Sequence, residues 1–303
     1  MALSNNTKGA LLMALSMAGF TFNDALSKAV TPLMNVGQLM FVRGALTTVL
    51  VFLVARHMGA LGHVRMLMRP TVLLRMLFET LAAVTFLSAL GQMPLANVSS
   101  ILQSLPLAVT LGAALFLGEP VGWRRWTAIG VGFLGVLIII RPGPEGFTLA
   151  SLYVLMSVVF AAARDLVTKK IDSGISSLAI TLSTAAGITV AGAALIVPFG
   201  GWQPMSASTW GIMLVASCLI FIGYLAIIMA MRTGEISFIA PFRYTSLLWA
   251  VTLGMVFFGE IPDIWMVVGT LIVIGSGLYA FYRENKRRAE MAMGEETLPG
   301  SSP

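Results

Sequence analysis

Ten apolar segments, each close to the length of a membrane-spanning helix, follow one another along this chain of 303 residues. A helix of roughly 20 mainly apolar residues is long enough to cross the hydrocarbon core of a bilayer. Charged residues make up only 11% of the chain, whereas soluble domains carry about 25%. The sequence therefore predicts an all-α integral membrane protein. The ten expected spans are residues 8–30, 35–55, 71–92, 95–117, 123–140, 147–169, 177–199, 208–231, 236–258 and 263–282.

Lysine and arginine in the connections predict the orientation of these spans, because cytoplasmic loops of membrane proteins are enriched in both. With the N-terminus in the cytoplasm, the external loops hold Arg141 alone. We therefore expect both termini to be cytoplasmic. Membrane topology also accounts for the net charge of +6, so no nucleic-acid partner is expected. The thirteen basic residues of the cytoplasmic segments are Lys8, Arg56, Arg65, Arg69, Arg124, Arg125, Lys169, Lys170, Arg232, Arg283, Lys286, Arg287 and Arg288.

One motif occurs twice in the chain. The residues Val-Thr-Leu-Gly at 109–112, followed by Gly118-Glu119, end the fourth span. The same four residues at 251–254, followed by Gly259-Glu260, end the ninth span. The sequence numbers of the two glutamates differ by 141, which indicates an internal repeat.

A second pair of residues repeats with the same offset. Asp24 and Lys28 are spaced i, i+4 in the first span, and Asp165 and Lys169 hold the corresponding positions in the sixth. Since five spans form one copy, the second copy enters the membrane from the opposite side, as in the inverted repeats of many secondary transporters. The alternative is a chance similarity among apolar helices. We predict repeats over residues 1–143 and 144–283, followed by a polar cytoplasmic tail over 284–303.

This arrangement resembles the EamA-type drug/metabolite transporters and, among them, the YddG-type amino-acid exporters. The resemblance implies a cavity between the halves, lined mainly by the first four helices of each. It also implies peripheral fifth helices that mediate a homodimer, and a place in the bacterial inner membrane. Ile261 departs from the pattern, because the first copy has Pro120 there. The resemblance is carried by Leu117, Gly118, Glu119 and Pro120 with Gly130, Gly132 and Gly135, and by Phe258, Gly259 and Glu260 with Gly269, Gly275 and Gly277.

Charged residues inside the spans are candidates for function, because each costs about 2.5–3.5 kcal/mol at the centre of a membrane helix. Cations outnumber carboxylates among them, which would suit a carboxylate-bearing or otherwise anionic substrate. For Lys28 and Arg75, which lie near helix ends, snorkelling to the interface is an equal alternative. The set is Lys28, Arg43, Arg75, Arg164 and Arg243 against Asp24, Glu79 and Asp165.

Glu79 has two interpretations. It is spaced i, i+4 from Arg75, so the two side chains can pair on one helix face. If Glu79 is desolvated, it could instead carry a proton during transport. A static hydrogen bond between helices is the competing interpretation.

Two polar spans interrupted by proline occupy corresponding places in the halves, which is a pointer to a binding site in a transporter. Pro106 in the fourth span and Pro241 in the ninth each remove a backbone hydrogen bond. Polar side chains that only join helices are the alternative. The candidate substrate-binding residues are Arg43, Glu79, Asn97, Ser100, Gln103, Tyr224, Pro241, Arg243 and Tyr244, and the candidate gate residues are Asp24, Lys28, Arg164, Asp165 and Lys169.

No catalytic, metal or cofactor motif is visible. The chain has one cysteine, Cys218, and two histidines, His57 and His63, in one loop region. It has no Walker loop and no HExxH pair. We expect a secondary transporter that exports small polar metabolites, amino acids (aromatic or other neutral) first, by alternating access, with membrane lipid and the substrate as its partners. A passive channel or facilitator is the main alternative, and a membrane enzyme that uses a histidine is a weaker one.

Overall fold

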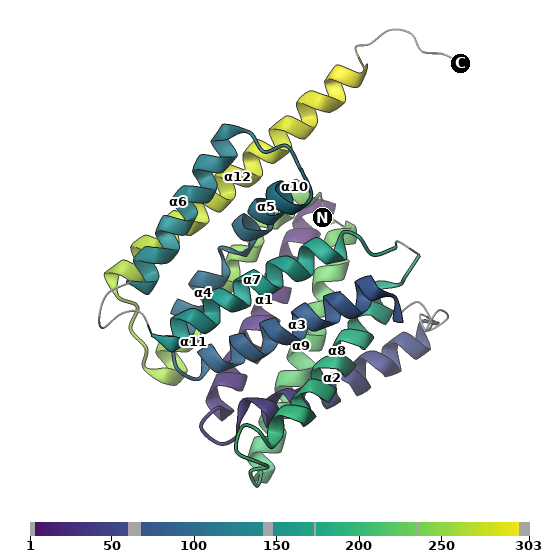
Figure 1. The fold of residues 1–303 in the computed structure, drawn as a ribbon, viewed down its shortest axis with the longest axis vertical. Coiled ribbons are helices and arrows are strands. Elements are labelled where there is room, and N and C mark those ends of the chain that lie inside the picture. Colours follow the sequence, from purple (N-terminus) through teal and green to yellow (C-terminus); the bar gives the residue numbers. More distant parts are fainter. Residues whose placement is uncertain (1–3, 60–67, 142–147, 173, 234, 297–303) are drawn as a thin grey trace.

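A computed structural model describes residues 4–59, 68–141, 148–172, 174–233 and 235–296. The described residues form helices and their connections, which confirms the all-α prediction (Figure 1). The helices are α1 (Asn5–Val30), α2 (Val36–His57), α3 (Pro70–Leu90), α4 (Leu95–Leu102), α5 (Leu105–Phe116), α6 (Trp123–Ile140), α7 (Leu149–Thr168), α8 (Ser177–Ile196), α9 (Ala207–Thr233), α10 (Ile236–Ile239), the 3-10 helix η2 (Ala240–Tyr244), α11 (Thr245–Phe258) and α12 (Ile264–Glu296).

Proline interrupts the fourth and ninth predicted spans at equivalent places. Pro106 lies in the first turn of α5, where its missing N–H costs no helical hydrogen bond. Pro241 likewise opens η2, which separates α10 from α11. With α4 and α5 taken together, nine spans in the described residues are long and apolar enough to cross a membrane, and the broken α10–η2–α11 segment supplies the tenth. The ten-span architecture is confirmed.

Helices from the two halves pair crosswise. The most extensive contacts join α1 with α9, α3 with α7, α2 with α8 and α6 with α12. The repeat offset makes α7 the counterpart of α1 and α9 the counterpart of α3. The α1–α9 and α3–α7 pairings are therefore equivalent. Because each of these pairs takes one helix from each half, the halves interlock along the length of the bundle (Figure 1).

Glycines allow α2 and α8 to approach closely. A Cβ atom on Gly192 would clash with the backbone nitrogen of Phe41, and one on Gly37 would lie 2.6 Å from the carbonyl carbon of Leu195. Small residues commonly permit such backbone contact between membrane helices. These glycines therefore set the distance between two helices that line the pocket described below.

The fifth helices of the two halves, α6 and α12, pack against one another along one edge of the bundle (Figure 1). A Cβ on Gly135 would meet the carbonyl oxygen of Gly269 at 2.8 Å, which shows how close they come. The polar tail expected over residues 284–303 begins as helix, because α12 continues to Glu296. Residues 297–303 lie outside the described part.

The bundle has two distinguishable ends. The beginning of α1 and the end of α12 lie at the same end (Figure 1), which we call the termini end. The other end holds the connections α1–α2, α3–α4 and α8–α9, and we call it the distal end. At the distal end the side-chain amide of Gln38 donates to the backbone carbonyl of Gln203 and accepts from its backbone N–H, each at 2.8 Å.

Candidate substrate site

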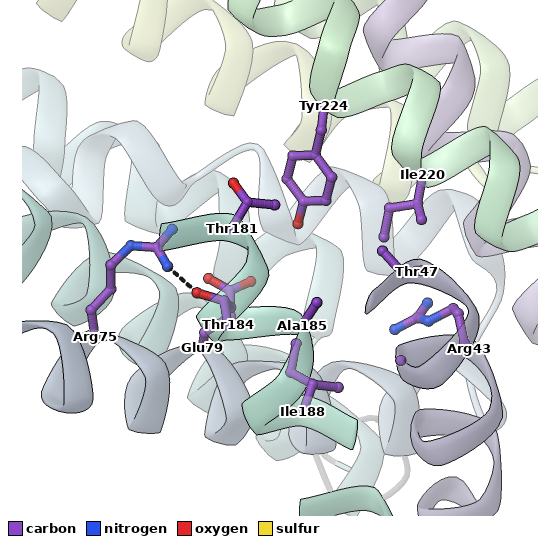
Figure 2. Close-up of a pocket in the computed structure, with 11 residues that line it drawn as sticks. Arg43, Thr47, Arg75, Glu79, Thr181, Thr184, Ala185, Ile188, Ile220 and Tyr224 are labelled. Carbon is purple, nitrogen blue, oxygen red and sulfur yellow. Dashed lines mark hydrogen bonds between the residues drawn. The ribbon is translucent and has the colours of Figure 1, made fainter. Parts of the chain in front are cut away.

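A pocket lies between helices of both halves, in the region where α2, α3, α8 and α9 meet (Figure 2). Its walls come from the second and third helices of each repeat. The lining residues are Arg43, Gly44 and Thr47 of α2, Arg75 and Glu79 of α3, Thr181, Thr184, Ala185 and Ile188 of α8, and Ile220 and Tyr224 of α9.

Most of this lining follows the internal repeat. Four pairs of lining residues hold equivalent positions in the two halves, because the sequence numbers within each pair differ by the repeat offset of 141. A pocket built from equivalent positions surrounds the axis that relates the two copies. This is where inverted-repeat transporters hold their substrates. The pairs are Arg43 with Thr184, Gly44 with Ala185, Thr47 with Ile188, and Glu79 with Ile220.

The equivalent positions differ in chemistry. The first half contributes the charged side chains, including Arg43 and Glu79, whereas the second half has the uncharged Thr184 and Ile220 at the positions equivalent to these two. The ring of Tyr224 extends from α9 with its hydroxyl directed into the pocket (Figure 2). The ring of Phe20 packs edge-on against it, with the two ring centroids 5.2 Å apart. The charged lining side chains therefore all come from α2 and α3, whereas α8 and α9 contribute threonine hydroxyls, aliphatic side chains and the tyrosine.

Arg43 is held at the buried edge of the pocket. Its side chain is only 8% exposed, and it donates to the hydroxyl of Ser27 at 3.2 Å. It also interacts electrostatically with Asp24, whose carboxylate accepts from the amide of Asn23 at 3.0 Å. The gate candidate Asp24 is thus a counter-ion of Arg43, on a neighbouring helix.

Glu79 takes part in a network of charges that also spans the halves. Arg164 of α7 donates to Glu79 at 2.8 Å and to its neighbour Asp165, also at 2.8 Å. The expected pairing of Glu79 with Arg75 on one helix face is therefore wrong. The crosswise packing of α3 against α7 brings a better-placed guanidinium to Glu79 than the one a turn away.

Arg75, for which snorkelling was an equal alternative, lines the pocket instead. It donates to the hydroxyl of Thr184 at 2.5 Å (Figure 2) and to that of Thr168 at 3.0 Å. Sequence reasoning gave no role to Thr184, which the repeat offset makes the counterpart of Arg43. That equivalence was the one available signal.

The hydroxyl of Thr47 is buried and has no hydrogen-bond partner among the described residues. Thr47 itself is 6% exposed and lines the pocket. Buried polar atoms are nearly always satisfied by protein, water or ligand. This hydroxyl is therefore available to a molecule in the pocket.

The cavity is small in this conformation. Its volume is about 50 Å³, whereas pockets for small molecules measure about 300–1,000 Å³. It has room for a few water molecules but not for a metabolite. Access by a substrate requires the surrounding helices to move apart.

The remaining predicted site residues lie outside the pocket, around the two proline breaks. Gln103 donates to the hydroxyl of Ser246 at 2.6 Å and so joins the α4–α5 break to α11. Ser100 is fully buried and donates to the carbonyl of Ala96 in its own helix at 2.7 Å. Asn97 lies on α4, while Pro241, Arg243 and Tyr244 lie on η2.

Two of these η2 residues have distinct surroundings. The hydroxyl of Tyr244 lies against Gly277 of α12, since a Cβ there would clash with it. Arg243 is exposed and interacts electrostatically with Asp165 and Arg164. The structure therefore brings Arg43, Glu79 and Tyr224 together, and it connects Arg243 to them only through the Arg164 network.

The lysines of the gate candidates do not pair within their own helices. Lys28 pairs with Glu260, and Lys169 pairs with Glu119. The i, i+4 spacing of Lys28 from Asp24 and of Lys169 from Asp165 therefore does not produce a pair within one helix. In both cases the partner belongs to the other half of the chain.

Other reactive side chains are scattered. Cys218 lies on α9 and His57 ends α2, while His63 lies outside the described residues. Across the described ranges, no group of three histidine, cysteine, aspartate or glutamate side chains could hold a metal ion.

Comparison with known proteins identifies the class to which this architecture belongs. A model of the EamA-like transporter family matches the chain twice, over residues 7–141 and 148–282. The chain belongs to this family. The first match begins at position 7 and the second at position 148, so the two are related by the offset of the repeat. Membership makes the chain a multi-pass membrane transporter and not an enzyme.

Several named transporters are similar to the chain. A riboflavin transporter of Vibrio cholerae is 30% identical over 217 residues, covering 71% of this chain and 72% of that protein. The pseudopaline exporter CntI of Pseudomonas aeruginosa is 25% identical, covering 90% and 96%. An S-adenosylmethionine uptake transporter of Rickettsia conorii is 26% identical, covering 94% and 96%.

A solved crystal structure has a similar fold. It aligns with a TM-score of 0.64 over 94% of this chain and 99% of its own, at 14% sequence identity. At that identity the likeness concerns the fold alone.

Proposed function

We propose that this protein is a secondary transporter that exports small polar metabolites carrying a carboxylate, with neutral amino acids as the first candidates, by alternating access. The observation that carries the proposal is the setting of Arg75. Its guanidinium faces the pocket and donates to two neutral threonine hydroxyls. The pocket carboxylate, Glu79, is paired with Arg164 instead. Arg75 therefore keeps a positive charge for which a substrate carboxylate is the natural partner.

The apolar part of the lining supports a substrate with an apolar part. Ile188, Ile220 and the ring of Tyr224 line the same pocket as Arg43 and Arg75. An amino acid with an aromatic or aliphatic side chain combines a carboxylate with such a part. The free hydroxyl of Thr47 adds one polar contact in the pocket.

Export is proposed from the resemblance to amino-acid exporters. The relatives named above include both an exporter and an uptake transporter, so direction varies within this group of similar proteins. We propose a cytoplasmic location for both termini in a bacterial inner membrane.

Counterflow in liposomes tests the substrate class. Purified protein is reconstituted with an unlabelled neutral amino acid inside, and the entry of the labelled compound is followed. We expect saturable uptake that is stimulated by the internal amino acid. Flux that rises linearly without saturation would indicate a channel, and the absence of trans-stimulation by every amino acid tried would reject the substrate class.

Arg75→Met isolates the role of the proposed anion site. We expect it to reduce counterflow about tenfold or more, because a hydrogen bond to a charged group contributes about 1.5–3 kcal/mol. Arg232→Met is the matched control, since Arg232 is an exposed arginine at the end of α9. Equal counterflow by the two variants would remove Arg75 from the site.

A further inference from the structure

Two ion pairs link the same two repeat positions crosswise. The ammonium of Lys28 lies 2.8 Å from a carboxylate oxygen of Glu260, and that of Lys169 lies 2.9 Å from Glu119. Lys169 is the counterpart of Lys28 by the repeat offset, and Glu260 is the counterpart of Glu119. Each pair therefore joins the first helix of one half to the Gly-Glu motif of the other.

The Gly-Glu motif has a local structure that places its carboxylate. Gly118 and Gly259 have φ values of 65° and 63°, in the left-handed region that favours glycine. The N–H of Glu119 then donates back to Ala113 at 3.2 Å, and that of Glu260 donates to Gly254 at 3.0 Å. This turn ends the helix at a glycine in the left-handed conformation, as many helices end. It presents the glutamate at the same position in both halves.

The two pairs differ in burial although their positions are equivalent. The side chains of Lys28 and Glu260 are 12% and 16% exposed, whereas those of Lys169 and Glu119 are 48% and 44% exposed. Since the two pairs hold equivalent positions near opposite ends of the bundle, this difference in burial indicates that one end is more tightly closed than the other. Lys28, near the end of α1, belongs to the distal end, and Lys169, at the end of α7, belongs to the termini end.

The distal pair also holds a third element in place. Lys28 donates to the carbonyl of Met93, and Glu260 accepts from the backbone N–H of Leu95 at 2.7 Å. These atoms belong to the turn between α3 and α4. One buried ion pair thus fastens α1, the end of α11 and the α3–α4 turn to one another across the distal end.

We propose that Lys28–Glu260 and Lys169–Glu119 are reciprocal latches of the transport cycle, with Glu119 and Glu260 as the gate residues that face the lysines. In this conformation the distal latch is closed and the termini-end pair is loose. In the opposite state Lys28 and Glu260 separate. Lys169 and Glu119 then become buried, and Glu119 accepts from the N–H of Ile236, which is the counterpart of Leu95 by the repeat offset. This inference rests on the proposed alternating access.

Accessibility of the pocket from each side tests the latches without any substrate. A single reporter cysteine is placed by Thr181→Cys in a Cys218→Ser background, and a membrane-impermeant maleimide is added to vesicles of either orientation. The transport rate of this background is measured first. We expect Glu260→Gln to raise the labelling rate from the distal side about tenfold, the size of coupling typical between two conformational states.

The equivalent change at the other end has a different expected result. Glu119→Gln weakens a pair that is already exposed, so distal labelling stays at or below the value of the unmodified background. Turnover nevertheless falls, because the opposite state loses its latch. Glu235→Gln is the matched control, an exposed glutamate before α10, and it should change neither readout.

A charge exchange separates the latch from general damage. Lys28→Glu combined with Glu260→Lys restores the ion pair but not the two bonds to Met93 and Leu95. It should therefore return distal labelling part of the way toward the background, while either single reversal should not. Equal distal labelling in Glu260→Gln and Glu235→Gln overturns the proposal, as does a distal opening by Glu119→Gln as large as that by Glu260→Gln. If labelling responds as expected but no amino acid is transported, the substrate class fails and the latches stand.

Discussion

The hydroxyl oxygens of Thr48 and Thr189 lie 3.3 Å apart, although the two residues hold the same position in opposite halves of the chain. Equivalent residues of an inverted repeat can touch only where the axis that relates the copies passes between them. The axis therefore runs through the crossing of α2 and α8. Arg43 and Gly44, within one or two turns of Thr48, line the pocket beside this crossing.

A larger side chain at the closest contact between α2 and α8 should destabilise the fold. We expect Gly192→Ala to lower stability by roughly 1–3 kcal/mol, because overpacking of a tight contact has that cost and its Cβ would clash with the backbone nitrogen of Phe41. Thermal unfolding in detergent measures the change. Gly130→Ala is the control, since no heavy atom lies within 4 Å of a Cβ at Gly130, and a comparable loss there would contradict the packing argument.

Arg164 should be more important to folding than an exposed cation. Arg164→Met leaves Glu79, whose side chain is 14% exposed, without its cation. Removing one partner of a buried pair costs about 3–5 kcal/mol. We expect a clearly lower unfolding temperature for Arg164→Met than for Arg232→Met. Similar values for the two variants would mean that the network contributes little to stability.

Glu79→Gln distinguishes the two interpretations of this carboxylate. Because Glu79 is engaged with Arg164 at 2.8 Å, we expect it to hold the network together and not to carry the coupled proton. Transport by the glutamine variant should be weaker, but the ratio of rates with and without a pH gradient should match that of the unmodified protein. A variant that transports but no longer responds to the gradient would assign the proton to Glu79.

The orientation of the bundle can be measured with reporter fusions. We expect reporters after Pro303 and after Gly59 to read cytoplasmic, and one inserted near Gly201 to read external. The physical reason is the retention of lysine- and arginine-rich loops on the cytoplasmic side. A cytoplasmic reading at Gly201 would contradict the topology, because the distal end would then face inward.

The spans were predictable because the length and apolarity of a membrane helix are local properties of the sequence. The fifth span, expected at 123–140, is α6, Trp123–Ile140. Pro106 and Pro241 likewise interrupt their spans through a local effect, the loss of a backbone donor.

The ion-pair partners were not predictable in this way. Arg75 and Glu79 have favourable spacing on one helix, but the packing of α3 against α7 decides which guanidinium reaches the carboxylate. Lys28 finds Glu260 only because the halves interlock, and the local sequence around either residue does not record that contact. The one indication in the sequence was the offset of 141, which relates the two lysines to each other and the two glutamates to each other.

The unequal chemistry of equivalent positions in the pocket has a consequence for the passage of cargo. Because the charged lining residues stand on α2 and α3 and the lining residues of α8 and α9 are uncharged, a bound molecule has one preferred orientation within the plane of the membrane. Exchanging the open and closed ends of the bundle does not move the charges to other helices. We therefore expect the molecule to cross without turning over, keeping its carboxylate toward the same two helices throughout the cycle.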